Sequence, residues 1–158
     1  FTFTNFINDY FTDKSALGFQ REGTGANLAL GKPVKVSSLT GDLVGSLAVD
    51  GDLGTLWNSG GGPTQWIEID LGAEYNIQEF RLTISQYPEG KTIHRILGRS
   101  ANGQFAVLTT FEGITVDGQA LVFTPAQLVL GIHFIRVETV SSPSWVAWRE
   151  IEVIDAGK

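Results

Sequence analysis

Residues 65–72 read QWIEIDLG, and from Ile67 onward apolar and acidic side chains alternate. Successive side chains of a β-strand point to opposite faces, so positions 67, 69 and 71 share an apolar face. The acidic residues at 68 and 70 occupy the opposite face, and a glycine closes the pattern. The stretch therefore predicts a half-buried strand that ends at Gly72.

Seven other segments carry comparable strand patterns. They cover residues 32–38, 80–84, 92–99, 105–111, 120–124, 132–140 and 147–154. Turn signals separate them, such as Ala-Asn-Gly at 101–103, Glu-Gly at 112–113 and Asp-Gly-Gln at 117–119. No segment keeps a helical period over about ten residues. The pattern predicts an all-β fold, either a β-sandwich or a jelly roll.

Length and composition indicate one domain and narrow its partners. The chain has 158 residues, 42% hydrophobic and 18% charged, without the run of roughly 20 apolar residues of a membrane-spanning helix. It contains no cysteine, which excludes disulfides, thiolate metal sites and thiol catalysis. A net charge of −6 argues against nucleic acid, which requires a basic face. Proteins, neutral or cationic glycans and metal ions remain.

The beginning of the chain differs from the rest. Five of the ten phenylalanines lie among the first 19 residues, and the run Arg-Glu-Gly-Thr-Gly follows at 21–25. We interpret residues 1–25 as an N-terminal extension or linker and residues 26–158 as the domain. Because the first residue is Phe1 and not methionine, we expect the chain to be part of a larger protein.

Residues 48–57, AVDGDLGTLW, form the part of the chain densest in oxygen ligands, with two carboxylates, two glycines and a hydroxyl. Calcium takes about six to eight oxygens, and a tight turn can supply them from main-chain carbonyls and short acidic side chains. An ordinary surface turn explains Asp-Gly-Asp equally well. These residues alone leave both interpretations open.

The order of six motifs along the chain is typical of a known family. They are NLALGKPV at 27–34, AVDGD at 48–52 with Thr55 and Trp57, QWIEIDLG at 65–72, SANG at 100–103, FIRV at 134–137 and WREIEV at 148–153. Together they resemble the discoidin domain, also called the coagulation-factor C-type domain, and most of all the bacterial family 32 carbohydrate-binding modules. The resemblance covers residues 27–154. It implies an eight-stranded antiparallel β-sandwich of jelly-roll type, like the galactose-binding domains.

The resemblance also implies a structural calcium ion (Ca2+) where the Asp-Gly-Asp turn meets the last strand. Carried over position by position, the ligands are the carbonyl groups of Leu47, Asp52 and Arg149, both oxygens of Thr55, and the side chains of Asp50 and Glu150. About seven oxygens with two formal charges suit calcium. Such an ion would stabilise the native state by joining distant parts of the chain. The alternative is that Glu150 is an ordinary solvent-facing strand residue.

No catalytic constellation is recognisable in the sequence. The acids lie in turns, on strand faces or in the implied calcium site, and do not form an evident carboxyl pair across a sugar site. His94 and His133 each begin a strand, and no Gly-x-Ser-x-Gly elbow accompanies them. We therefore expect a non-catalytic binding module and not an enzyme.

Alternating strand directions place residues 38–46, 58–64, 86–91 and 141–146 at one end of the sandwich. In the family resembled, loops at this end hold a sugar between an aromatic platform and planar polar groups. Trp145 is the first candidate for the platform and Tyr87 the second, with a rim position that caps the core as the alternative. Further candidate contacts are Asn58, Asp42, Gln86, Glu89, Lys91 and His94. The remaining tryptophans, Trp57, Trp66 and Trp148, are expected in the core or beneath the calcium turn.

The first and middle loops depart from the galactose-binding members of the family. Those members usually present a histidine and an arginine there, whereas residues 39–45 (LTGDLVG) and 86–91 (QYPEGK) contain neither. A galactose-type site is therefore in doubt, and an amino sugar or a different glycan is the alternative. Leu39, Leu43 and Val44 could instead meet a protein or lipid surface.

These observations favour a calcium-stabilised carbohydrate-binding module, secreted or at the cell surface. It would hold an appended bacterial enzyme near a polysaccharide or a glycoprotein glycan. The main alternative is a discoidin-type adhesion domain that binds protein or lipid surfaces. A third is a structural spacer within a large enzyme.

Overall fold

The computed structural model describes residues 25–157, so the extension predicted for residues 1–25 lies outside the described residues except for Gly25. The elements are β1 (Val34–Val36), the 3₁₀ turn η1 (Gly45–Ala48), β2 (Trp57–Asn58), β3 (Gln65–Ser85), β4 (Gly90–Arg99), β5 (Ala106–Thr115), β6 (Ala120–Phe123), β7 (Val129–Ser141) and β8 (Ala147–Asp155). The predicted all-β, eight-stranded fold is confirmed. Within residues 25–157, no helix has the length and apolar character needed to cross a membrane.

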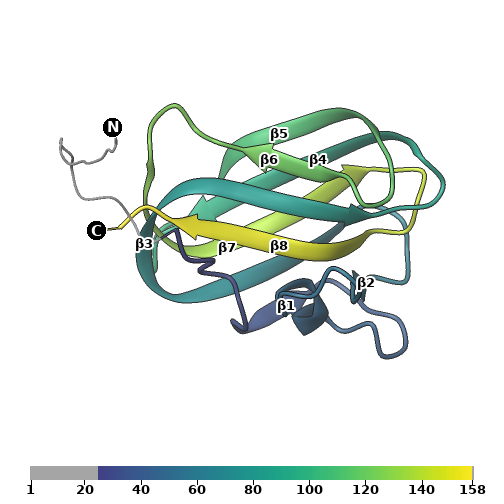
Figure 1. The fold of residues 1–158 in the computed structure, drawn as a ribbon, viewed down its shortest axis with the longest axis horizontal. Coiled ribbons are helices and arrows are strands. Elements are labelled where there is room, and N and C mark those ends of the chain that lie inside the picture. Colours follow the sequence, from purple (N-terminus) through teal and green to yellow (C-terminus); the bar gives the residue numbers. More distant parts are fainter. Residues whose placement is uncertain (1–24, 158) are drawn as a thin grey trace.

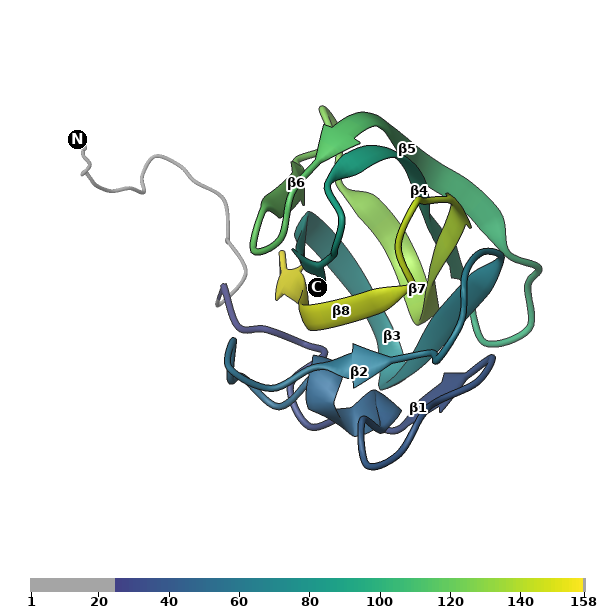
Figure 2. The same cartoon turned by 90° about the vertical axis from the view of Figure 1, so that its right-hand side faces the viewer.

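Strand β3 organises the sheet. Neighbouring strands follow the order β2-β8-β3-β7-β4-β5, and β1 and β6 also pair with β3. The first half of β3 pairs with β1 and β7, and its second half pairs with β6 and β8, in every case antiparallel. β3 thus passes from one layer to the other (Figure 1), and Figure 2 shows the strands wrapped around a common interior.

Two strand boundaries differ from the prediction. Gly72 does not end its strand: with φ at 87° it falls where the register between β3 and β7 shifts, and the chain remains part of β3. A glycine at positive φ can bend a strand in this way without leaving the sheet. Glu112 and Gly113, predicted as a turn, lie inside β5 because the ladder with β4 continues through both residues.

The core uses the apolar face predicted for β3. Ile67, Ile69 and Leu71 are fully buried, and Trp57 pairs with Trp148 between β2 and β8 with both side chains fully buried. Burial of a large apolar side chain contributes about 1.5–3 kcal/mol. The core positions predicted for these two tryptophans are therefore confirmed.

Trp66, expected in the core or beneath the calcium turn, does not lie in the core. Its half-buried ring lies on the outer face of β3, where the Cζ atom of Arg136 is 4.5 Å from the ring centroid. Because the next residue, Ile67, points inward, the strand period sends Trp66 outward.

The loops predicted to gather at one end do so. The Thr40 N–H donates to the carbonyl of Asn58 at 3.1 Å, and the Ser59 N–H donates to the carbonyl of Val146 at 2.9 Å. The Tyr87 N–H donates to Oγ of Ser144 at 3.1 Å. These bonds join the connections around residues 40, 59, 87 and 144 into one surface, at the right-hand end of Figure 1.

Candidate functional site

Four of the groups implied as calcium ligands converge around the turn at residues 50–55, which we call the acid turn. The Thr55 hydroxyl donates to Oδ2 of Asp50 at 2.6 Å. The carbonyl oxygens of Asp52 and Leu47 lie 3.0 and 3.5 Å from the same hydroxyl. The Asp50 carboxylate also accepts the Asp52 N–H at 2.9 Å, which closes the turn. Four oxygen-bearing groups are thus gathered by the local sequence.

Glu150 reaches the acid turn from β8. Its side chain is 3% exposed and accepts the Gly51 N–H at 3.1 and 3.2 Å. Burial raises the pKa of Glu150 to about 7, with a further contribution from the nearby carboxylates, chiefly Asp50. No ion pair within residues 25–157 involves Glu150. The alternative that Glu150 faces solvent is wrong, and its carboxylate lacks a compensating cation.

The donor set of the acid turn fits calcium better than a transition metal. No group of three or more His, Cys, Asp or Glu side chains among the described residues could hold a metal ion by itself. The implied set of Leu47, Asp50, Asp52, Thr55, Arg149 and Glu150 instead relies on two carboxylates, a hydroxyl and main-chain carbonyls. Hard neutral oxygens with few charges are ligands that calcium accepts and zinc does not favour. Calcium at this turn stays a prediction.

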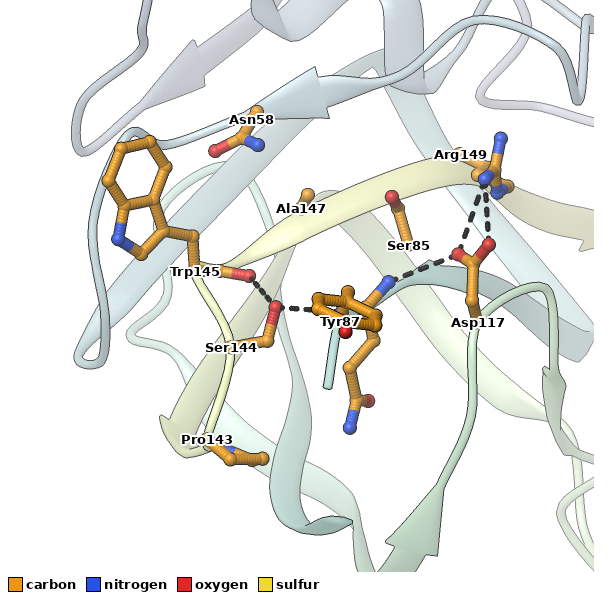
Figure 3. Close-up of a pocket in the computed structure, with 10 residues that line it drawn as sticks. Asn58, Ser85, Tyr87, Asp117, Pro143, Ser144, Trp145, Ala147 and Arg149 are labelled. Carbon is orange, nitrogen blue, oxygen red and sulfur yellow. Dashed lines mark hydrogen bonds and ion pairs between the residues drawn. The ribbon is translucent and has the colours of Figure 1, made fainter. Parts of the chain in front are cut away.

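A cleft of about 520 Å³ lies at the loop end of the sandwich. It is lined by Asn58, Ser85, Gln86, Tyr87, Asp117, Pro143, Ser144, Trp145, Ala147 and Arg149. These residues come from the ends of β2 and β3, the start of β8 and three connecting loops (Figure 3). The volume falls within the range of small-ligand sites, roughly 300–1,000 Å³.

Two aromatic side chains stand in the cleft with most of their surface in solvent. Tyr87 is 89% exposed and Trp145 is 56% exposed. Ser144 holds both loops in place, because its hydroxyl accepts the Tyr87 N–H at 3.1 Å and donates to the Trp145 carbonyl at 3.0 Å. Exposed apolar rings that the backbone fixes in a concave surface are typical of a binding site.

An ion pair occupies the side of the cleft away from Trp145 (Figure 3). Nη2 of Arg149 donates to the two carboxylate oxygens of Asp117 at 3.0 and 3.3 Å, and the Gln86 N–H donates to the same carboxylate at 3.1 Å. The hydrogen bond from Arg149 is the main reason that the pKa of Asp117 lies below its ordinary value. Nη1 of Arg149 also donates to the carbonyl of Leu53, in the acid turn, at 3.3 Å.

The sequence interpretation placed neither of these side chains in the cleft. The sequence pattern predicts a turn at Asp117, and the family resemblance implies a role only for the carbonyl of Arg149. For Arg149 a signal existed: if Glu150 points to the calcium turn, its neighbour on the strand must point to the other face. For Asp117 no local signal exists, because its partner lies 32 residues away.

Of the predicted sugar contacts, Trp145, Tyr87, Asn58 and Gln86 line the cleft. The amide of Gln86, however, is turned inward: the residue is 5% exposed, donates to the carbonyls of Pro88 and Thr115, and accepts the Thr115 hydroxyl. The geometry therefore does not support Gln86 as a ligand contact.

The other predicted contacts are not among the residues that line the cleft, namely Asp42, Glu89, Lys91 and His94. Lys91 pairs with Glu112 at 3.4 Å. His94 is 2% exposed, and its Nδ1 shares a 2.8 Å hydrogen bond with the Thr139 hydroxyl. Burial lowers the pKa of His94 to about 4, so the ring is neutral at pH 7. The prediction that His94 faces the ligand is wrong, because the alternation of β4 turns this residue inward.

Comparisons with known proteins agree with the fold. The family model described as a NedA-like, galactose-binding domain, of the coagulation-factor C type, matches residues 47–120. The predicted resemblance to this family is confirmed. No curated protein sequence matches the chain.

Several solved structures share this discoidin-like fold. Chitosan-binding module 1 of a chitosanase/glucanase from Paenibacillus sp. IK-5 is 25% identical, with a TM-score of 0.67 over 81% of this chain and 98% of that chain. The family 32 module of NanJ from C. perfringens, in complex with galactose, is 17% identical, with a TM-score of 0.66 over 79% and 94%. The Clostridium perfringens module CpGH89CBM32-4, in complex with GlcNAc-α-1,4-galactose, is 18% identical, with a TM-score of 0.68 over 90% and 100%.

Proposed function

We propose that this chain is a non-catalytic carbohydrate-binding module whose ligand occupies the cleft between Tyr87 and the start of β8. The observation that carries the proposal is the cleft itself, in which two exposed aromatic rings stand among polar side chains. A sugar ring stacks its apolar face on such an aromatic surface, and its hydroxyls need donors and acceptors beside it. The proteins that share this fold include modules solved with sugars.

We further propose that calcium at the acid turn supports the fold and takes no part in chemistry. The ion would supply the positive charge that the buried Glu150 lacks, and Asp50, Thr55 and the carbonyls of Leu47, Asp52 and Arg149 would complete its shell. It would thereby hold β8 against the segment that leads into β2.

We also propose that the module serves an appended enzyme outside the cell, at a polysaccharide or a glycoprotein glycan. The support is that one similar module derives from a chitosanase/glucanase. The polymer that the cleft binds would then be the polymer on which the appended enzyme acts.

The test is glycan binding in saturating calcium, first on a glycan array and then by isothermal titration. A single cleft of this kind should bind with micromolar to millimolar Kd, about −4 to −8 kcal/mol. Trp145→Ala and Tyr87→Ala should lose binding, whereas Ile114→Ala, which trims an exposed apolar side chain on β5, should retain it. A wild-type protein that binds no glycan would contradict the proposal.

One observation favours a second function, binding to a lipid or protein surface. Leu39 and Val44 are 47% and 38% exposed in the first loop, next to the connection that carries Asn58. Co-sedimentation with vesicles of phosphatidylcholine and phosphatidylserine separates the two functions. A Leu39→Ser variant should lose vesicle binding only if the second function holds.

A further inference from the structure

The charges of the cleft consist of one acid and one base. Among its lining residues only Asp117 and Arg149 carry a charge at pH 7, and they are paired with each other. The acidic residues of the neighbouring loops, Asp42 and Glu89, do not line the cleft. The cleft is therefore close to neutral even though the whole chain carries a net charge of −6.

Both partners remain accessible to a ligand. The side chain of Asp117 is 50% exposed and that of Arg149 is 26% exposed. A carboxylate offers about four lone-pair sites and a guanidinium five N–H donors, more than their present contacts use. The pair is also fixed in position, because Asp117 accepts the Gln86 N–H and Arg149 donates to the Leu53 carbonyl.

A hydroxyl can both donate and accept a hydrogen bond, so two adjacent hydroxyls can accept from Arg149 and donate to Asp117 at the same time. An ammonium group can only donate hydrogen bonds, and the positive guanidinium of Arg149 would repel it. A sugar carboxylate only accepts and would stand against Asp117. Like charges at short range therefore act as a repulsive element against a charged sugar, in addition to the contacts that a neutral sugar gains.

We propose that the Asp117–Arg149 pair is the specificity determinant of the cleft and restricts it to neutral pyranoses with adjacent hydroxyls. This inference rests on the proposed function and names its ligand class. It differs from the amino sugar considered from the sequence, since the acidic residues of the neighbouring loops, Asp42 and Glu89, lie outside the cleft lining and cannot pair with an ammonium group there. Removal of the Asp117 charge should make the cleft favour anionic sugars, and removal of the Arg149 charge should make it favour cationic sugars.

The experiment compares four soluble probes by isothermal titration in saturating calcium. Two are neutral, β-1,4-galactobiose and the N-acetylglucosamine tetramer; one is cationic, the glucosamine tetramer; one is anionic, the galacturonic acid tetramer. The wild type should bind a neutral probe about tenfold more tightly than either charged probe. Asp117→Asn should raise the affinity for the galacturonic acid tetramer, relative to that for a neutral probe, by about tenfold. Arg149→Gln should raise the relative affinity for the glucosamine tetramer by about the same factor.

Matched controls separate a local effect from the net charge of the chain. Arg95→Gln changes the net charge by the same amount as Arg149→Gln, and Glu112→Gln by the same amount as Asp117→Asn. Arg95 lies on β4 and Glu112 on β5, both outside the cleft lining. These variants should keep the wild-type ratios. Thermal melts verify folding; if Arg149→Gln unfolds because its own carbonyl and the neighbouring Glu150 belong to the proposed calcium site, Asp117→Asn alone decides.

The outcomes distinguish this inference from the function on which it rests. If the wild type binds none of the four probes and no glycan on an array, both are overturned. If Trp145→Ala abolishes glycan binding but the charge variants keep the wild-type ratios, the module function stands and this inference is overturned. A wild type that prefers a charged probe overturns it as well.

Discussion

The acid turn and the cleft meet at two consecutive residues of β8, Glu150 and Arg149. The Glu150 side chain is buried against the acid turn, whereas the Arg149 side chain faces the cleft and is partly exposed. The acid turn is made by six consecutive residues and one strand, but the cleft is made by several segments that are distant in sequence. One strand thus supports a site that belongs to the fold and a site that belongs to a ligand.

The two sites differ in how much each one costs the stability of the folded state. Within the described residues the acid turn holds a buried carboxylate without a cation, which is costly to the folded state. The cleft holds exposed rings and a satisfied ion pair, which cost the folded state little. We therefore expect changes at the acid turn to alter stability and changes at the cleft to alter binding.

The largest expected effect is that of calcium on stability. At free calcium a thousandfold above its Kd, the free energy of unfolding should rise by about 4 kcal/mol over the value in chelator. For a domain of this size that raises the melting temperature by about 8–16 °C. Glu150→Gln should abolish most of the response, whereas Glu152→Gln, whose carboxylate pairs with Arg81, should keep it. Identical melting temperatures in calcium and in chelator would contradict the proposed calcium site.

The second effect is a loss of stability in acid through His94, beneath the cleft. Its pKa is lowered by burial to about 4, whereas the unfolded chain takes up the proton near pH 6.5. Stability from this residue is therefore complete above pH 6.5 and is lost as the pH falls toward 4. The loss should reach about 3 kcal/mol, at about 1.4 kcal/mol per pKa unit.

Urea unfolding in saturating calcium measures this loss, because calcium bound as proposed at the acid turn would keep Glu150 from titrating in the same range. His94→Phe removes the titrating group but keeps a ring of similar size beside Trp148. The difference in unfolding free energy between wild type and variant should change by about 3 kcal/mol across the window. Curves that stay parallel from pH 6.5 to 4 would show that His94 does not titrate with unfolding.

The parts of the structure that the sequence predicts also differ between the acid turn and the cleft. The core face of β3 and the acid turn were predictable because alternation and short-range hydrogen bonds determine them. Within the cleft, Trp145 and Tyr87 could be found as large aromatics that loops do not require. Asp117 could not, because only the folded chain brings it to Arg149.

Two wrong predictions had a correct signal beside them. His94 lies two residues before Ile96, a fully buried position of the same strand, so the period of two assigns it to the interior. Trp66 precedes the buried Ile67 and must face outward by the same rule. The His94 prediction follows from the chemistry of an imidazole at a sugar site and the Trp66 prediction from the family resemblance, but the strand register is the better guide to both.

The third prediction concerns the independence of the two sites. Trp145→Ala should weaken glycan binding about tenfold or more, because stacking on the ring is lost. The same variant should change the free energy of unfolding by no more than about 0.5 kcal/mol, since Trp145 is largely exposed. Titration and melting of one preparation measure both. A variant that loses binding and several kcal/mol of stability together would make Trp145 a structural residue that caps the core.

The smallest expected effect is that of salt on glycan affinity. An uncharged sugar meets a cleft in which Asp117 and Arg149 cancel, so raising sodium chloride from about 50 to 500 mM should change the Kd by less than about twofold. Calcium affinity should fall several-fold over the same range, because salt screens the attraction of Asp50, Asp52 and Glu150 for the ion. Equilibrium titrations of both ligands at each salt concentration give the comparison. If glycan affinity instead falls in step with calcium affinity, the cleft responds to charge like the acid turn, and the contrast between the two faces of β8 does not hold.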